Sequence, residues 1–307
     1  MTGWGYESWF VSARDPAGQR ALWIRHTRHR PRQGRPAAAL WCTVADRGQS
    51  GPPTVVKQVF DDLPAGAVAG PGRFRGEAAM AGQAASWDLA VVGGEPLLRH
   101  LRPALLYRAP LPRTKLEAQV PHGIVSGEVR VSGSVTALSG WRATVGHNWG
   151  SEHADSWVWL HADGFGDEPD DWLELVFARV RAGPALLPWT AFGALSLGGR
   201  RLPLGGLGRL GRPATVAADY ARLAATLPAP GARVELTVMA DPAEAAVLTY
   251  ADPAGGTRVV SHCALAGAAL TLRRPGGDLD LTADLCAYEY GTAHATPGIE
   301  PRPLPQE

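Results

Sequence analysis

Glycine and proline occur along the whole chain, and their spacing limits the length of any helix or strand. The 307 residues include 37 Gly and 26 Pro, spread along the chain rather than gathered in one tract. Because both residues favour turns and interrupt helices, this spread indicates many short elements joined by turns. A hydrophobic fraction of 45% is that of an ordinary folded protein, so these elements can bury a sizeable core.

Segments with the composition of β-strands lie between these glycine and proline residues. They cover residues 6–12, 21–27, 39–45, 54–60, 127–135, 157–162, 172–181, 233–240, 245–250, 258–264, 268–273 and 285–290. Helical patterns are weak, since residues 76–85 are rich in small side chains and residues 216–227 fit either a helix or a poor strand. Many strands joined by turns predict an all-β fold of the sandwich or barrel type.

The charge balance and the cysteines exclude several classes of protein. Thirty Lys+Arg against 29 Asp+Glu give a net charge of +1, whereas a nucleic-acid binder carries a large positive excess. No stretch approaches the ~18 apolar residues of a membrane span, and the first ten residues lack a secretion signal, so we expect a cytoplasmic protein without an integral membrane segment. Cys42, Cys263 and Cys286 stand far apart, and we expect buried free thiols.

Three patterns suggest sites that their surroundings do not support. Residues 206–211 fit GxGxxG literally, but no βαβ alternation surrounds them, so a flexible loop is favoured over a dinucleotide site. The basic run at 28–36 lacks interleaved aromatics, and the acidic run at 163–171 lacks the spacing of a calcium loop. We expect both to be solvated hairpin tips, although the basic run leaves open an interaction module for an anionic partner.

The side chains that could form a functional site are most concentrated in a tryptophan-rich segment. Six of the eleven tryptophans fall in it, namely Trp141, Trp149, Trp157, Trp159, Trp172 and Trp189. We expect Gly146 and Gly150 to bracket a tight turn that presents the polar and aromatic side chains between them, and we expect a pocket there. The histidines of this segment do not have the spacing of a recurring metal-ligand pattern, so no metal site is predicted. A structural role for the histidines, with the tryptophans filling the core, is the alternative.

The strand period of two predicts which side chains share a face. It places Glu7 with Trp9 and, on the next strand, Trp23 with Arg25. After the predicted turn it places Trp157, Trp159 and His161 together. Faces that mix aromatic bulk with charge are typical of strands that line a ligand cavity, or of strands that face solvent.

The run Gly146-His147-Asn148-Trp149-Gly150, followed by Trp157-Val158-Trp159, resembles the signature of the family of AttH-like proteins and bacterial carotenoid 1,2-hydratases (hydroxyneurosporene synthase), and more distantly tocopherol cyclase. Residues 6–10, 21–27 and 288–291 also resemble segments of AttH-like proteins. The resemblance implies two tandem lipocalin-like (calycin-type) antiparallel β-barrels, which we place at residues 1–150 and 151–307. It also implies a hydrophobic ligand of the isoprenoid, polyketide or lipid class and no cofactor.

The same resemblance implies roles for single residues. In the hydratases the histidine and tryptophan of the motif matter, and these match His147 and Trp149. This sequence departs from the hydratases because Ala143-Thr144-Val145-Gly146 precedes His147, where they have an acidic residue. An acid must then come from elsewhere, and the candidates are Glu7, Glu152, Asp155, Glu174 and Glu289. Glu174 is the most attractive because it shares a strand face with Trp172, where burial favours a neutral, proton-donating carboxyl.

Two functional hypotheses follow. The first is an enzyme that hydrates, cyclises or isomerises an alkene, with the catalytic residues His147, Asn148, Trp149, Glu152 and Glu174. Its predicted ligand-binding residues are Glu7, Trp9, Trp23, Arg25, Trp157, Trp159, His161, Trp172 and Glu289. The second is a non-catalytic carrier or sequestering protein with the same cavity. The sequence leaves the oligomeric state open.

Overall fold

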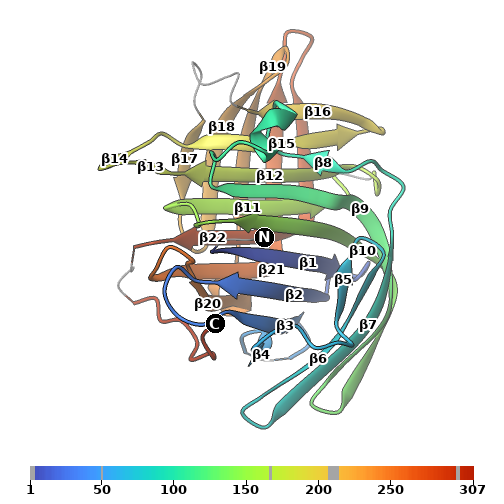
Figure 1. Cartoon of the computed structure of the whole chain (residues 1–307). Helices are drawn as coiled ribbons and strands as arrows, with labels where there is room; N and C mark the ends of the chain where they lie inside the picture. Colours follow the sequence, from blue (N-terminus) through green and yellow to red (C-terminus); the bar gives the residue numbers. More distant parts are fainter. Residues whose placement is uncertain (1–3, 50, 166–167, 207–213, 295–297) are drawn as a thin grey trace.

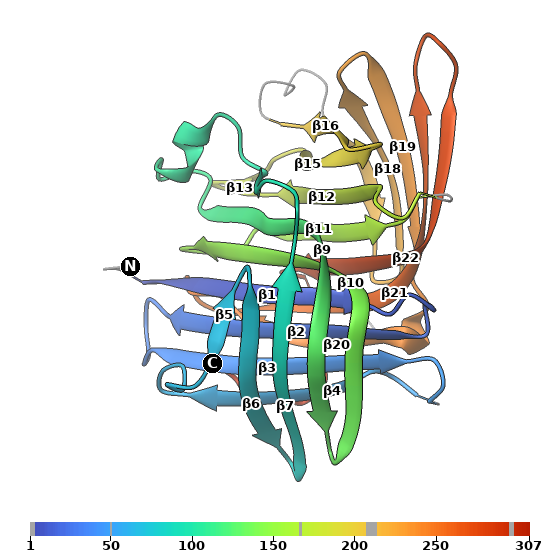
Figure 2. The ribbon, with the colours of Figure 1, turned by 90° about the vertical axis from the view of Figure 1, so that its right-hand side faces the viewer.

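Two antiparallel sheets of ten strands each make up the fold (Figures 1 and 2). The structure is a computed structural model that describes residues 4–49, 51–165, 168–206, 214–294 and 298–307. Short turns join nearly all neighbouring strands, as the spread of glycine and proline indicates. The prediction of an all-β fold is confirmed.

The first sheet runs in the order β4-β3-β2-β1-β10-β9-β7-β6-β5, with β8 on β9. Its strands are β1 (Gly5–Arg14), β2 (Arg20–Arg30), β3 (Ala37–Asp46), β4 (Thr54–Phe60), β5 (Val68–Gly70), β6 (Arg73–Met80), β7 (Gln83–Val92), β8 (Leu98–Arg99), β9 (Thr114–Val131) and β10 (Ser134–Gly150). A short 3-10 helix, η1 (Ala104–Tyr107), lies in the connection between β8 and β9.

The second sheet runs in the order β16-β15-β12-β11-β22-β21-β19-β18-β17, with β20 on β21. Its strands are β11 (Ser156–Asp163), β12 (Trp172–Arg179), β15 (Thr190–Leu197), β16 (Arg200–Gly205), β17 (Thr215–Ala218), β18 (Arg222–Ala229), β19 (Ala232–Met239), β20 (Ala245–Ala251), β21 (Thr257–Arg273) and β22 (Leu279–Thr292). A separate hairpin consists of β13 (Arg181–Ala182) and β14 (Ala185–Leu186), and a 3-10 helix, η3 (Pro242–Glu244), precedes β20.

Both sheets follow one plan. In each, three strands extend outward from the first strand of the sheet, and that first strand also pairs with the last, β1 with β10 and β11 with β22. The additional strand outside this order is also repeated, since β8 joins β9 as β20 joins β21. The chain therefore contains the same lipocalin-like strand order twice in tandem.

Apolar side chains pack in three large clusters. One core lies inside the first sheet and includes Val11 and Val145, and a second lies inside the second sheet and includes Val158 and Leu160. The third lies between the sheets, where alternate residues of β1–β3 meet alternate residues of β11 and β20–β22. It contains Phe10, Trp23, Trp41, Trp159, Val176, Leu248 and Tyr250, all buried. The two sheets are thus packed face to face, with β20 behind β2 and β3 in Figure 1.

Local turn geometry explains the two segments with helical character. Residues 76–85 form part of the β6–β7 hairpin, because Ala81 and Gly82 both have positive φ, as a two-residue turn requires. In residues 216–227, Asp219 Oδ1 accepts hydrogen bonds from the backbone N–H groups of Ala221 and Arg222 at 2.8 Å each and turns β17 into β18. Strand pairing outweighs the helix propensity of small residues at both places.

The loop predictions have mixed outcomes. The basic run at 28–36 does lead from β2 into β3, but the acidic run at 163–171 is not simply solvated, because Asp163 and Asp171 are buried. The three cysteines are free and buried, as predicted. Residues 207–211 of the GxGxxG run lie outside the described residues. No helix long and apolar enough to cross a membrane occurs in the described part of the chain.

Candidate functional site

The Gly-His-Asn-Trp-Gly motif forms the end of β10, so the predicted turn at residues 146–150 is wrong. Gly146 lies opposite Phe10 in β1, and a Cβ atom on Gly146 would lie 2.2 Å from the Phe10 ring. A Cβ atom on Gly150 would lie 2.1 Å from the carbonyl oxygen of Arg113. These glycines therefore permit close packing against neighbouring atoms rather than a reversal of the chain.

Gly146→Ala is expected to lower the free energy of unfolding by about 1–3 kcal/mol, because the added methyl group overpacks the Phe10 ring. Chemical denaturation measures the change. Gly267→Ala is the matched control, since the nearest atom to a Cβ there is Ala283 O at 4.0 Å, and its stability should change little. Equal effects of the two substitutions would contradict the packing role of Gly146.

His147 lies in a group of side chains in the first sheet. Its imidazole stacks on Trp9 and Trp149, with ring centroids 5.1 Å and 4.5 Å apart. Its Nε2 lies 3.1 Å from Glu7 Oε1, and its Nδ1 lies 3.8 Å from Glu117 Oε1. Trp9 also packs against the core of the first sheet, so this group faces that core. Asn148 lies opposite Ser8 and belongs to the other face of the sheet.

Glu174 lies in a different group, between the two sheets. Its carboxyl is almost fully buried, and Oε1 accepts a hydrogen bond from Trp159 Nε1 at 2.7 Å. His100 Nε2 lies 3.5 Å from the same oxygen, on the connection that follows β8. Glu174 Oε2 and both ring nitrogens of His100 have no hydrogen-bond partner among the described residues. Glu174 therefore presents a free carboxyl oxygen inside the protein.

Glu289 is the second carboxylate between the sheets. It accepts hydrogen bonds from Trp157 Nε1 at 2.8 Å and from the Tyr250 hydroxyl at 2.9 Å, and His262 Nδ1 lies 3.6 Å away. Burial alone would raise the pKa of Glu289, but His262, the Trp157 N–H and Arg25 outweigh burial and lower it. Burial and the charge of Glu289 raise the pKa of Tyr250 well above its usual value. Glu289 is thus held as a carboxylate.

Aromatic rings connect the two carboxyl groups. Trp159 stacks on His262 at 6.4 Å, and His262 stacks on Trp23 at 4.7 Å. Arg25 lies beside Trp23 with its Cζ atom 4.0 Å from the centroid of the Tyr250 ring, and its Nη1 has no partner among the described residues. We call this set the intersheet band, and it comprises Trp23, Arg25, His100, Trp157, Trp159, Glu174, Tyr250, His262 and Glu289.

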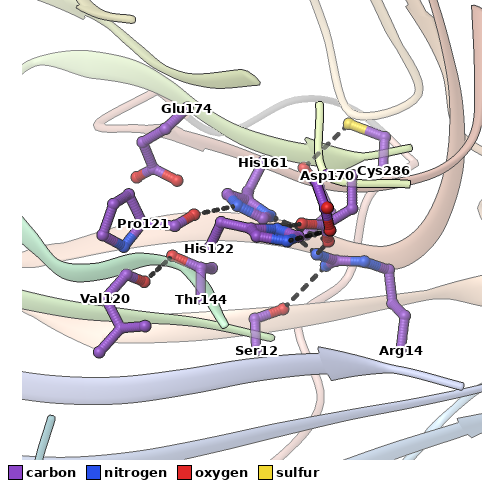
Figure 3. A network of polar contacts seen from close by, with 12 residues as sticks. Ser12, Arg14, Val120, Pro121, His122, Thr144, His161, Asp170, Glu174 and Cys286 are labelled. Carbon is purple, nitrogen blue, oxygen red and sulfur yellow. Dashed lines mark hydrogen bonds and ion pairs between the residues drawn. The ribbon is translucent and has the colours of Figure 1, made fainter. Parts of the chain in front are cut away.

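His161 belongs to a neighbouring network with a structural geometry (Figure 3). Its Nε2 donates to the Pro121 carbonyl oxygen at 2.8 Å, so its Nδ1 accepts a hydrogen bond from Arg14 Nη2 at 2.7 Å. Arg14 also pairs with Asp163 at 2.5 Å, across the two sheets. Burial lowers the pKa of His161, which favours the neutral ring. This network links β1 to β11 and leaves His161 without a free nitrogen for a ligand.

The structure therefore divides the predicted site residues among several places. Glu174, Trp159, Trp157, Glu289, Trp23 and Arg25 come together in the intersheet band, and Glu7, Trp9, His147 and Trp149 form the other group. Glu152 forms a partly exposed ion pair with Arg113 at 2.6 Å, and Trp172 donates to Glu95. Sequence reasoning missed His100, Tyr250 and His262, which stand in segments without a motif.

Two hollow regions accompany these groups. A pocket of about 10 Å³ adjoins the intersheet band and is lined by Tyr6, Arg25, Trp41 and Tyr250 among others. A larger cavity of about 680 Å³ opens at β12, β18 and β22 of the second sheet, with Trp189 and Tyr290 in its wall. Among the described residues, no group of three or more His, Cys, Asp or Glu side chains is arranged to hold a metal ion.

Comparison with known proteins places the fold. No family model matches the sequence. An uncharacterised protein of Mycobacterium tuberculosis, found in two strains, is 28% identical over 226 residues, which are 71% of this chain and 66% of the relative. This chain thus spans just under two thirds of the length of the curated relatives that it matches.

Solved structures match nearly the whole chain. A protein described as an AttH from Nitrosomonas europaea aligns over 95% of this chain and 93% of its own, with a TM-score of 0.55 and 15% identity. CghA, crystallised with Sch210972, aligns over 94% of this chain and 88% of its own, with a TM-score of 0.56 and 13% identity. The predicted resemblance to AttH-like proteins is therefore confirmed at the level of the fold.

Proposed function

We propose that this chain, with its AttH-like pair of lipocalin-like sheets, binds an apolar small molecule in the intersheet band and transfers a proton to it from Glu174. One observation carries the proposal, namely the buried polar atoms of the band that have no hydrogen-bond partner among the described residues. They are Arg25 Nη1, Glu174 Oε2 and both ring nitrogens of His100 and of His262. Buried polar atoms in folded proteins are nearly always hydrogen-bonded, so this concentration is typical of a surface that a bound molecule or ordered water completes.

The geometry of Glu174 suits proton donation to an alkene. Trp159 Nε1 holds Oε1 at 2.7 Å, which leaves Oε2 as the oxygen that meets the substrate. Protonation of one alkene carbon leaves a carbocation at the other, and the faces of Trp159 and Trp23 stabilise such a charge by about 0.5–2 kcal/mol per ring. Loss of a proton from the cation gives isomerisation, and attack by water or a hydroxyl gives hydration or cyclisation.

Glu289 has a complementary role in this proposal. Its lowered pKa keeps it ionised, so it supplies negative charge near the carbocation or accepts the proton that leaves. Two buried carboxyl groups with different neighbours are the usual arrangement for an acid and a base in one site. The crystallisation of CghA with the small molecule Sch210972 supports the idea that a fold of this kind accommodates a ligand.

The 680 Å³ cavity favours a second candidate function, carriage without chemistry. Its volume lies in the range of about 300–1,000 Å³ that is typical of small-molecule sites, and Trp189, Val216 and Met239 give it apolar walls. No residue of the intersheet band lines it. A ligand held there would be away from Glu174.

Titration with farnesol, an apolar isoprenoid alcohol, distinguishes the two candidates. Isothermal titration calorimetry of Trp23→Ala is expected to show at least a tenfold weaker affinity than the unsubstituted protein, whereas Trp189→Ala should bind as before. The reverse result would support the carrier. Native mass spectrometry of the purified protein, with a panel of isoprenoids and fatty acids, provides the wider test, and no uptake of any compound would contradict both candidates.

A further inference from the structure

Residues 298–307 cross the outer margin of the intersheet region and are held there by three kinds of contact. The backbone N–H of Arg302 donates to the Val247 carbonyl oxygen at 3.0 Å. Leu304 is buried in the apolar cluster between the sheets, and Glu307 has a side chain only 8% exposed. Figure 1 shows this end of the chain beside β2, β3 and β20.

The Glu307 carboxylate reaches donors from three adjacent strands. Its Oε1 accepts hydrogen bonds from Thr27 Oγ1 in β2 at 2.7 Å and from Trp41 Nε1 in β3 at 3.2 Å. Lys57 Nζ in β4 lies 3.8 Å from the same oxygen. Two hydrogen-bond donors and one cation that converge on one oxygen make a preformed site for a carboxylate.

A cross-strand row of two cations explains why an anion is needed at this position. Arg25 and Lys57 each lie directly opposite Trp41 in the neighbouring strands. Lys57 Nζ is 4.0 Å from the centroid of the Trp41 ring, and Arg25 Cζ is 5.6 Å from it. Both cations are buried, and a buried cation is costly without a compensating anion. Burial lowers the pKa of Lys57 to about 8, although Glu307 partly offsets this.

A small pocket lies beside Glu307. Tyr6, Arg25, Trp41 and Tyr250 line it together with Glu307, and its volume of about 10 Å³ has room for about one water molecule. Arg25 Nη1, which has no partner among the described residues, belongs to the same wall. Arg25 and Tyr250 belong to the intersheet band, so the pocket beside Glu307 is continuous with that band.

We propose that Thr27, Trp41 and Lys57 form an anion site for the acidic group of the ligand, and that Glu307 occupies this site as an internal competitor. This inference rests on the proposed binding of a ligand in the intersheet band. It assigns the ligand to a chemical class, an apolar molecule that carries a carboxylate. Binding of the ligand then displaces residues 298–307 from their present position.

Farnesoic acid and farnesol, which share one carbon chain and differ in the carboxylate, are the matched probes. Calorimetry should show that Glu307→Ala binds farnesoic acid at least tenfold more tightly than the unsubstituted protein does, with a smaller gain for farnesol. Lys57→Met should bind the two probes with equal affinity, whereas Lys57→Arg should keep the preference for the acid. Arg20→Met, a substitution of an arginine whose side chain is 40% exposed, is the charge control and should behave as the unsubstituted protein.

Three other outcomes would contradict the anion site, the internal competitor or the proposed function. Equal affinity for both probes in every variant would overturn the anion site and leave the proposed function intact. An unchanged affinity of Glu307→Ala for farnesoic acid, with loss of the preference in Lys57→Met, would overturn the internal competitor alone. If neither probe binds any variant, although thermal unfolding shows them folded, the proposed function fails first.

Discussion

Arg14→Met is expected to lower the free energy of unfolding by about 3–5 kcal/mol, because it leaves the buried carboxylate of Asp163 without its guanidinium partner. The two side chains are 1% and 2% exposed and join β1 to β11 at 2.5 Å. Urea denaturation followed by circular dichroism measures the loss. Arg20→Met, at the end of the same hairpin with a 40% exposed side chain, should cost about 1 kcal/mol or less.

A double variant tests the reason for this loss. Arg14→Met combined with Asp163→Leu removes both charges, and most of the lost stability should return, since replacement of a whole buried pair by apolar side chains is often neutral. If the double variant is as unstable as the single one, the lost hydrogen bond to His161 Nδ1 accounts for the effect instead.

The pH dependence follows from the same pair. Burial alone would raise the pKa of Asp163, but the Arg14 guanidinium and the hydrogen bond with His122 outweigh burial and hold it well below its usual value. The contribution of Asp163 to stability is therefore fully present above about pH 4, the pKa of an unfolded Asp, and is lost only at lower pH. In Arg14→Met, protonation at low pH removes the unpaired buried charge of Asp163. We therefore expect the difference in the free energy of unfolding between Arg14→Met and the unsubstituted protein to decrease as the pH falls.

Glu174→Gln is expected to reduce turnover by about 10²–10⁴-fold while the affinity for the ligand changes less than threefold. The amide keeps the shape of the side chain and an oxygen for Trp159 Nε1, but it has no proton to transfer. The assay follows conversion of the apolar species found by native mass spectrometry, as gain of water for hydration or as a shift in retention time for isomerisation.

Glu152→Gln is the control for this assay, because Glu152 lies in a partly exposed ion pair with Arg113 outside the intersheet band. Its turnover should equal that of the unsubstituted protein. Equal rates for Glu174→Gln and the unsubstituted protein would remove Glu174 from the mechanism. Binding of the ligand without turnover by the unsubstituted protein would favour the carrier function.

The fold could be predicted because its main determinants are local. Turn-forming glycines and the period of two along each strand are visible in any short window, so the all-β class was accessible from the sequence. The prediction of a turn at residues 146–150 was wrong for a physical reason, since glycine occurs both in tight turns and where neighbouring atoms pack closely. The atom that requires Gly146 belongs to Phe10, which the sequence places far away.

The candidate site could also be predicted only in part from the sequence. The strand face shared by Glu174 and Trp172 was predictable from the period of two, but the contact of Glu174 with His100 comes from a connection without a pattern. Asp163 was expected in a solvated loop because its sequence neighbours are acidic, yet its partner Arg14 lies 149 residues away. Nothing in residues 298–307 indicates that Glu307 reaches Lys57. Contacts of this kind depend on how the two sheets pack.

The pairing of the first strand of each sheet with the last has a consequence for synthesis on the ribosome. Glu7 and His147 meet across the β1–β10 pair although 140 residues separate them. At about 5–20 residues per second, one edge of β1 waits roughly 7–28 s for its partner strand to be made. An unpaired strand edge is a template for association with other chains, so this edge of β1 stays open to such association until β10 emerges. The second half repeats the same delay with β11 and β22.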